Sequence, residues 1–201
     1  MVKWTVEKSS VNGKQILVDR RTLIVGAAAT AIGLPHAVRA ETVAPNELFA
    51  QAGDRIQIIK GEMKGKLLRP EMLTEAAKPI EAFPFDPKNE VLRRRNRQNR
   101  LLVLRLNPDE MEASTRELSV EGVLAYSAIC THRACTIKAW KVEERHLRCH
   151  CHLTEFAALT GGTVMTGPAQ RQLPMVPLGI DDDGFVIAKG GFTDKPGGKT
   201  T

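Results

Sequence analysis

The pattern of apolar and polar residues changes near residue 100. Beyond it, short apolar runs rich in strand-forming residues recur, beginning with 101–107 (LLVLRLN) and 121–129 (EGVLAYSAI). Four more runs lie between 146 and 190, separated by turn signals such as Gly161-Gly162 and the sequence DDDG at 181–184. This spacing predicts an all-β domain, either a sandwich or stacked small antiparallel sheets, with one charged, helical turn between the first two runs.

The segment from 41 to 100 has a mixed pattern. Residues 53–61 (GDRIQIIKG) begin and end with glycine, and polar and apolar residues alternate in part between them, which predicts a strand. Residues 70–78 (PEMLTEAAK) begin at a proline and predict a short helix, whereas 83–90 (FPFDPKNE) is punctuated by prolines and predicts a loop. The segment is interpreted as an N-terminal extension or base of the domain, which either adds strands or contacts a partner.

Five arginines fall within the eight residues 93–100 (RRRNRQNR). Such a run is most often a solvated loop or strand edge. The more specific hypothesis is a docking patch for an acidic partner surface.

The net charge of +6 suggests binding to nucleic acid, but the distribution of the charged residues along the chain argues against it. Residues 1–40 carry six basic and two acidic groups, so the remaining chain has a net charge of only +2. Nucleic-acid binding therefore loses its main support. The same forty residues contain Arg20-Arg21, the mildly apolar run 22–35, and small residues at Val38 and Ala40 before a candidate cleavage point.

Adjacent arginines before a weak apolar run are typical of a twin-arginine export signal, which delivers folded, cofactor-containing proteins to the bacterial periplasm. The run is too short to cross about 30 Å of hydrocarbon unless it is extended through Pro35 and His36. A cleaved signal over 1–40 is therefore favoured over a retained membrane anchor.

All four cysteines lie between 130 and 151, beside three histidines. Two boxes, CTHRAC and CHCH, give the pattern C-x-H-x16-C-x2-H. This pattern suits a [2Fe–2S] cluster in which Cys130 and Cys149 bind one iron while His132 and His152 bind the other. Replacing two thiolates by imidazoles raises the reduction potential and allows electron transfer to be coupled to a proton.

The remaining pair, Cys135 and Cys151, is best explained as a disulfide that joins the two loops, which an oxidising compartment permits. Two alternatives stay open. Zinc also accepts two cysteines and two histidines, but it leaves the extra cysteine in each box unexplained. Two plain disulfides would give His132 and His152 no role.

The boxes CTHRAC and CHCHLTEF, followed by TGPAQRQLP, resemble the Rieske proteins of cytochrome bc complexes and of arsenite oxidase. The resemblance covers about 120–189 and implies one [2Fe–2S] cluster held by two hairpin loops within 130–152. It assigns the ligands, the loop disulfide and a shielding proline loop at 167–174. The residues implied to tune or shield the cluster are Thr154, Gly167 and Pro168. The Rieske domain is then 101–190, with a flexible tail at 191–201.

Several residues depart from the family pattern. Ala134 replaces a usual glycine, which costs stability if the backbone there needs a positive φ. Arg133 replaces an apolar residue that helps to seat quinone, His150 replaces a proline, and Phe156 replaces the tyrosine of high-potential members. Thr154 retains the hydroxyl of the usual serine. Arg133 favours an acidic protein partner, and Phe156 predicts a lowered potential.

These features predict an exported one-electron carrier with no substrate site of its own. The string CHLTEF favours the small subunit of a periplasmic oxidoreductase similar to arsenite oxidase. The alternative is the Rieske iron–sulfur subunit of a ubiquinol–cytochrome c reductase, anchored in the membrane if the signal is retained. The chain is too short to add the catalytic domain of a Rieske oxygenase. A zinc-stabilised binding module would be colourless. Both leading hypotheses require a redox partner protein.

Overall fold

The computed structural model describes residues 43–198, and the predicted signal at 1–40 lies outside them. The regular secondary structure of the described part is mostly β-strand, with one short α-helix and three 3₁₀ turns, at Pro70–Met72, Arg97–Asn99 and Pro108–Glu110. Its elements are β1 (Arg55–Ile58), β2 (Ile80–Asp86), β3 (Val91–Leu92), β4 (Leu101–Arg105), α1 (Ala113–Glu117), β5 (Val123–Ser127), β6 (Ala139–Lys141), β7 (His146–Arg148), β8 (Glu155–Ala157), β9 (Thr163–Thr166), β10 (Leu178–Ile180) and β11 (Val186–Ala188).

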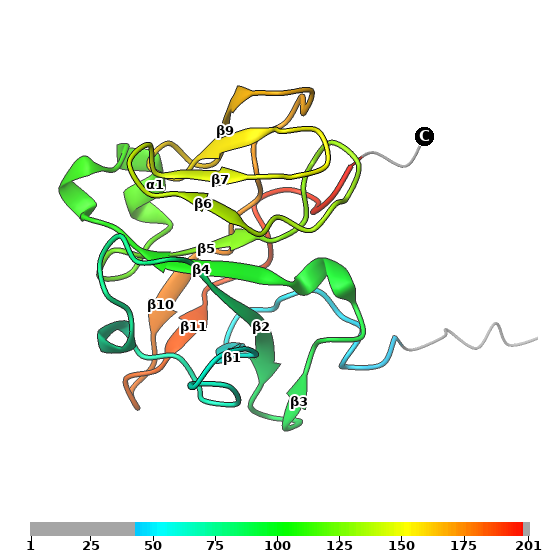
Figure 1. The fold of residues 1–201 in the computed structure, drawn as a ribbon. Coiled ribbons are helices and arrows are strands. Elements are labelled where there is room, and N and C mark those ends of the chain that lie inside the picture. Colours follow the sequence, from blue (N-terminus) through cyan, green and yellow to red (C-terminus); the bar gives the residue numbers. More distant parts are fainter. Residues whose placement is uncertain (1–42, 199–201) are drawn as a thin grey trace, which may run out of the picture. The chain divides into compact units, whose positions relative to one another are not determined.

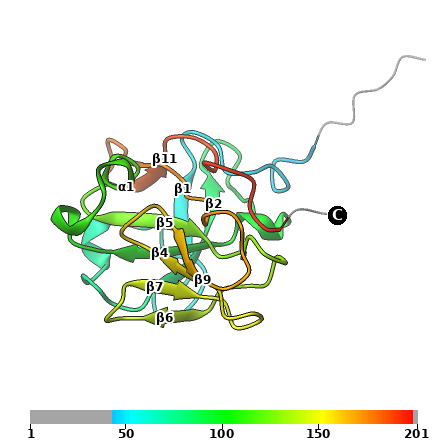
Figure 2. The ribbon, with the colours of Figure 1, turned by 90° about the horizontal axis from the view of Figure 1, so that it is seen from above.

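Within residues 43–198 the strands form two antiparallel sheets. The larger has seven strands in the order β10-β11-β1-β2-β4-β5, with β3 paired to β2, and the smaller has the order β6-β7-β8-β9. A bridge between Tyr126 in β5 and Met175, just before β10, curls the larger sheet toward closure. Figure 1 shows the smaller sheet lying over β4 and β5, and Figure 2 shows the same layers from above. The predicted all-β fold of stacked antiparallel sheets is confirmed.

Strands β4 and β5 are buried on both faces, because they lie between two apolar cores. Leu102 and Leu104 of β4 contribute to the core under the smaller sheet, together with Leu147 of β7 and Phe156 of β8. The alternate residues, such as Leu101, contribute to the core formed with β1, β10 and β11. Side chains alternate between the faces of a strand, so a continuous apolar run identifies a strand covered on both sides. The first cysteine loop, which follows β5, therefore starts from one of the most buried strands.

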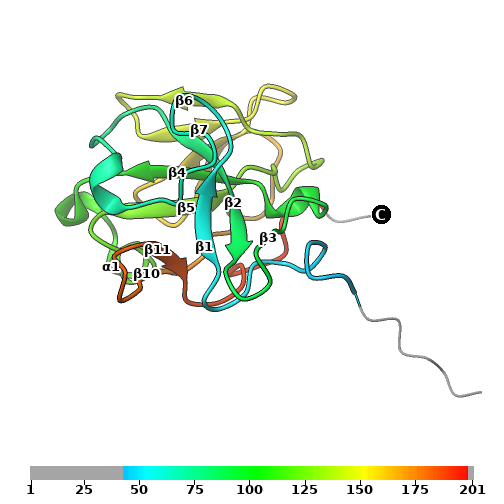
Figure 3. The same ribbon diagram turned by 90° about the horizontal axis from the view of Figure 1, so that it is seen from below.

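The segment before residue 100 supplies β1, β2 and β3 of the larger sheet, as Figure 3 shows from below. The predicted strand at 53–61 is confirmed as β1. The predicted loop at 83–90 is wrong, because β2 continues to Asp86 and includes Pro84. Pro84 pairs with Ile56 on one side, and on the other it lies in the gap between the β4 and β3 pairings. A proline is tolerated there because no neighbouring strand needs its missing amide.

The predicted helix at 70–78 is also wrong beyond its first turn. Only the proline-initiated turn at Pro70–Met72 is helical. The Ala76 amide instead donates to the Arg105 carbonyl at 2.9 Å, and Ala76 has a φ of 55°. Pairing with the end of β4 thus overrides a weak local helix preference. Among residues 43–198, no helix is long and apolar enough to cross a membrane.

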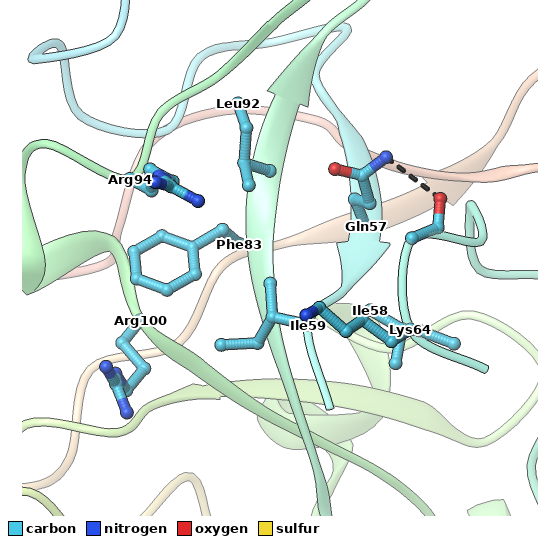
Figure 4. A pocket seen from close by; sticks show the side chains of 9 residues that line it. Gln57, Ile58, Ile59, Lys64, Phe83, Leu92, Arg94 and Arg100 are labelled. Atoms are coloured by element: carbon cyan, nitrogen blue, oxygen red, sulfur yellow. Dashed lines mark hydrogen bonds between the residues drawn. The ribbon is translucent and has the colours of Figure 1, made fainter. Parts of the chain in front are cut away.

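The arginine run at 93–100 divides into buried and exposed members. Arg93 is only 4% exposed and pairs with two buried carboxylates, Asp54 and Asp86. Arg94 and Arg100 line a cavity of about 490 Å³ together with Phe83 (Figure 4). The interpretation of the run as one solvated loop is therefore wrong for Arg93.

Candidate metal centre

The first cysteine box forms a tight loop at the end of β5. The Cys130 amide donates to the Cys135 carbonyl at 2.9 Å, and the Ala134 amide donates to the Cys130 carbonyl at 3.0 Å. A bridge between Ile129 and Thr136 closes the base of the loop. Cys130 is buried, whereas His132 is half-buried toward the tip. The loop thus presents one thiol inward and one imidazole outward.

The second box connects β7 to β8. Its base is closed by a hydrogen bond from the Cys149 amide to the Thr154 carbonyl at 2.8 Å. Cys149 is 1% exposed, and His152 is exposed at the tip. Leu153 reverses the chain with a φ of 57°. His150 is exposed as well.

A disulfide joins the two loops through Cys135 and Cys151, with a Cα–Cα distance of 6.6 Å, which confirms the predicted disulfide. The Cys149 sulfur lies within 4.8 Å of both disulfide sulfurs. These three sulfurs are not a ligand set, because two of them are bonded to each other. Cys130 and Cys149 are the two free cysteines of the described chain.

The two histidines also meet across the loops. Their Nδ1 atoms lie 3.2 Å apart, and their ring centroids are 4.5 Å apart at an interplanar angle of 84°. Desolvation, the His152 ring and Arg133 lower the pKa of His132, in that order of importance. A neutral imidazole is the form that binds a metal.

Burial raises the pKa of the Cys130 thiol to about 11, although the amides of His132 and Arg133 lower it in part. A buried thiol without a metal therefore stays protonated, whereas a metal would hold it as the thiolate. The buried sulfurs and exposed imidazoles give two sides of different donor chemistry. This donor set fits a cluster with one sulfur-ligated and one imidazole-ligated iron.

Two further features agree with a bound group. The Thr154 hydroxyl is buried and has no hydrogen-bond partner within the described residues. Buried hydroxyls normally have a partner, so this oxygen suits a cluster sulfur as acceptor. Gly167 has a φ of 92°, and a Cβ there would lie 2.5 Å from the Thr154 Cα. Only glycine lets the proline loop approach Thr154 so closely.

The proline loop packs beside the cysteine loops. Pro168 is exposed, whereas Ala169 is buried in the core that also contains Cys130 and Cys149. The Thr131 hydroxyl donates to the Arg171 carbonyl at 2.7 Å, which ties the first cysteine loop to the proline loop. The sequence does not predict the contact between Thr131 and Arg171, because neither residue is a metal ligand and they are 40 positions apart.

Ala134 has a φ of 55°, in the left-handed region, at the position where the resemblance to the Rieske family implies glycine. We expect Ala134→Gly to stabilise the protein by about 1 kcal/mol, since glycine adopts this conformation without steric strain. Urea unfolding followed by circular dichroism measures the change. Ala52→Gly is the control, because exposed Ala52 lacks a positive φ and its replacement should destabilise. No gain at Ala134 would contradict the assigned strain.

Comparisons with known proteins agree with this geometry. The family model of the Rieske [2Fe-2S] domain matches residues 86–177. A cytochrome bc1 complex Rieske iron-sulfur subunit of Streptomyces lividans is 36% identical over 120 residues, which cover 59% of this chain and 67% of that protein. A putative respiratory nitrate reductase subunit Rieske of Haloferax mediterranei is 31% identical over 147 residues, covering 72% of this chain and 62% of the relative.

Among solved structures, the soluble domain of Rieske protein II from Sulfolobus acidocaldarius is 31% identical, with a TM-score of 0.33. The match covers 34% of this chain and 40% of that one. The share of the relatives' own length varies widely: it is 32% for the cytochrome bc1 complex Rieske subunit of Streptomyces coelicolor and 24% for that of Mycobacterium tuberculosis.

Proposed function

Because this chain belongs to the family of Rieske [2Fe–2S] proteins, we propose that it is the Rieske iron–sulfur subunit of a cytochrome bc1-type respiratory complex. It is a Rieske electron-transfer protein that binds one [2Fe–2S] cluster. The similarity to the Streptomyces lividans subunit over two thirds of that protein's length carries the finer assignment. This is the alternative that the sequence ranked second, and the relatives favour it over the arsenite oxidase type.

The proposed ligands are Cys130 and Cys149 for one iron and His132 and His152 for the other. The bound cluster supplies one-electron chemistry. The buried cysteine side excludes water, whereas the exposed histidine side faces a partner. The disulfide holds the two loops in register, and Thr154 offers its hydroxyl to a sulfur. Each imidazole keeps one ring nitrogen that can hold or release a proton at the surface.

A second candidate is the Rieske subunit of another respiratory oxidoreductase. It is supported by the similarity to the Haloferax mediterranei protein and by exposed Arg133, which disfavours an apolar quinone pocket beside His132. We propose export through the twin-arginine route, supported by Arg20-Arg21 and the short apolar run after them.

Purification of the tagged full-length protein with its native complex separates the two candidates. We expect copurified b- and c-type haem, and quinol oxidation that His152→Ala abolishes. Molybdenum without haem would favour the other oxidoreductase.

Electron paramagnetic resonance of the reduced protein should show the low average g of mixed cysteine and histidine ligation. A colourless, zinc-containing protein would overturn both candidate functions. N-terminal sequencing of exported protein tests the signal.

Phe156 is fully buried in the same core as Cys130 and Cys149. We expect Phe156→Tyr to raise the reduction potential by about 40 mV, because a hydroxyl donating to a cluster sulfur stabilises the reduced state by about 1 kcal/mol more than the oxidised state. Redox titration measures the shift, and Phe156→Leu is the control that adds no donor. An unchanged potential together with lower stability would mean that the hydroxyl finds no acceptor.

A further inference from the structure

The C-terminal segment, defined here as residues 191–198, packs against the cluster-binding loops. The sequence predicts a flexible tail here, yet Pro196 and Gly197 are buried. Figure 1 shows this segment, in red, at the end of the domain that carries the loops. Thr193 and Met175 are joined by two hydrogen bonds, of 2.8 and 3.0 Å, and the side-chain amide of Gln98 donates to the Pro196 carbonyl at 3.2 Å. The segment is therefore anchored along its length.

Arg171 of the proline loop makes the densest set of contacts to this segment. Its guanidinium forms an ion pair with Asp194 and donates to the Gly197 carbonyl at 2.7 Å. Two longer contacts of 3.4 Å reach the Lys195 carbonyl. The Arg171 carbonyl meanwhile accepts the bond from Thr131. One residue thus connects the proline loop, the first cysteine loop and the C-terminal segment. An isolated surface ion pair would contribute little, but a planar fork with several acceptors fixes geometry.

The end of the segment lies directly on the first cysteine loop. A Cβ at Gly198 would overlap the His132 carbonyl oxygen and lie 3.3 Å from the Arg133 Cα. A Cβ at Gly197 would touch Ala134 and Ile129 at 3.4 Å. Because the contact at Gly198 is with the backbone, a side chain there cannot be accommodated by a rotamer change. The glycine allows the segment to cover the loop.

We propose that Arg171 is a positioning residue, which clamps the C-terminal segment over the first cysteine loop as a further wall of the metal centre. This proposal rests on the proposed function. The disulfide joins the two cysteine loops to each other, and the proline loop contacts the first of them through Thr131. The clamped segment covers the backbone around His132 and restrains it. Release of the segment would let water and small molecules reach this loop without changing any ligand.

Two variants release the segment by different means. Arg171→Gln removes the charged fork, and Gly198→Ala introduces the overlap with His132. Matched controls are Arg94→Gln, which replaces an exposed arginine, and Gly190→Ala, where a Cβ would meet nothing within 4 Å. All are tested as full-length, cluster-loaded protein. The readouts are amide exchange of Thr193, iron release to bathophenanthroline after reduction, and the reduction potential.

In both variants we expect hydrogen exchange at the Thr193 amide and release of iron to be about tenfold faster than in wild type. We also expect a higher reduction potential, because water stabilises the more negative reduced state of the cluster. The controls should match wild type. The double variant should resemble either single one, because both act by detaching the same segment. Additive effects, or faster iron release without faster exchange at Thr193, would overturn the clamp. Absence of a cluster from wild type would instead refute the proposed function.

Discussion

Replacing Cys135 and Cys151 together by serine is expected to lower the free energy of unfolding by about 3 kcal/mol and to abolish stable cluster binding. The disulfide closes a loop with a sequence separation of 16, for which the chain-entropy model gives a loss of this size. The functional effect arises because the bond joins the two loops beside Cys149. Without it, no covalent bond holds together the two loops that carry His132 and His152. Urea unfolding and the visible iron–sulfur absorption measure both effects.

Three comparisons isolate the role of the disulfide. Reduction of the wild-type protein under anaerobic conditions should reproduce the double variant. Thr136→Ser, next to Cys135, should leave stability and absorption unchanged. Cys149→Ser should abolish the cluster but retain the disulfide and most of the stability it provides. Full cluster occupancy in the double variant would contradict the idea that the bond holds the two loops in register.

The metal centre could be predicted from the sequence because its chemistry is local. Each box places one cysteine and one histidine within four residues, so the donor types and their spacing are visible before any fold is known. The extra cysteine of each box likewise indicated a bond between the loops, and Cys135–Cys151 confirms it. The assignment of the four ligands remains a prediction to be tested by spectroscopy.

The all-β architecture could be predicted because β4 and β5 are buried on both faces and therefore appear as continuous apolar runs. The structure of the base of the domain, residues 41–100, could not be predicted in the same way. Pro84 suggests a loop because the gap beside β2 exists only after β3 and β4 have paired on either side of it. Residues 70–78 have a local pattern that suggests a helix, because the sequence does not show that this segment pairs with the distant Arg105. Local preference fails where long-range pairing decides the conformation.

The same reasoning explains the charged and glycine-rich segments. The sequence shows five arginines in a run but cannot show that Asp54, 39 residues earlier, buries one of them. It shows a lysine- and glycine-rich tail at 191–201 but not that Arg171 fixes residues as far as Gly197. In both cases an arginine fork finds acceptors that only the fold brings together.

Replacing Arg93 by methionine is expected to lower the free energy of unfolding by about 3–5 kcal/mol at pH 7, because it leaves two buried carboxylates without their cation. Arg93 Nε lies 2.7 Å from Asp54 Oδ2, and Nη2 lies 2.9 Å from Asp54 Oδ1 and 3.0 Å from Asp86 Oδ2. Urea unfolding measures the loss. Arg95→Met is the matched control, because that side chain is 66% exposed and its change should stay within about 0.5 kcal/mol.

The pH dependence distinguishes an uncompensated charge from lost packing. The Asn89 side-chain amide, backbone amides and Arg93 hold the pKa of Asp86 below its usual range, against the effect of burial. In wild type this stabilisation is present above the unfolded pKa of about 3.9 and is lost as the pH falls through the folded pKa. In Arg93→Met the carboxylate protonates at higher pH, which relieves the buried charge. The difference in stability between variant and wild type should therefore shrink in acid, whereas a loss due to packing alone would be independent of pH.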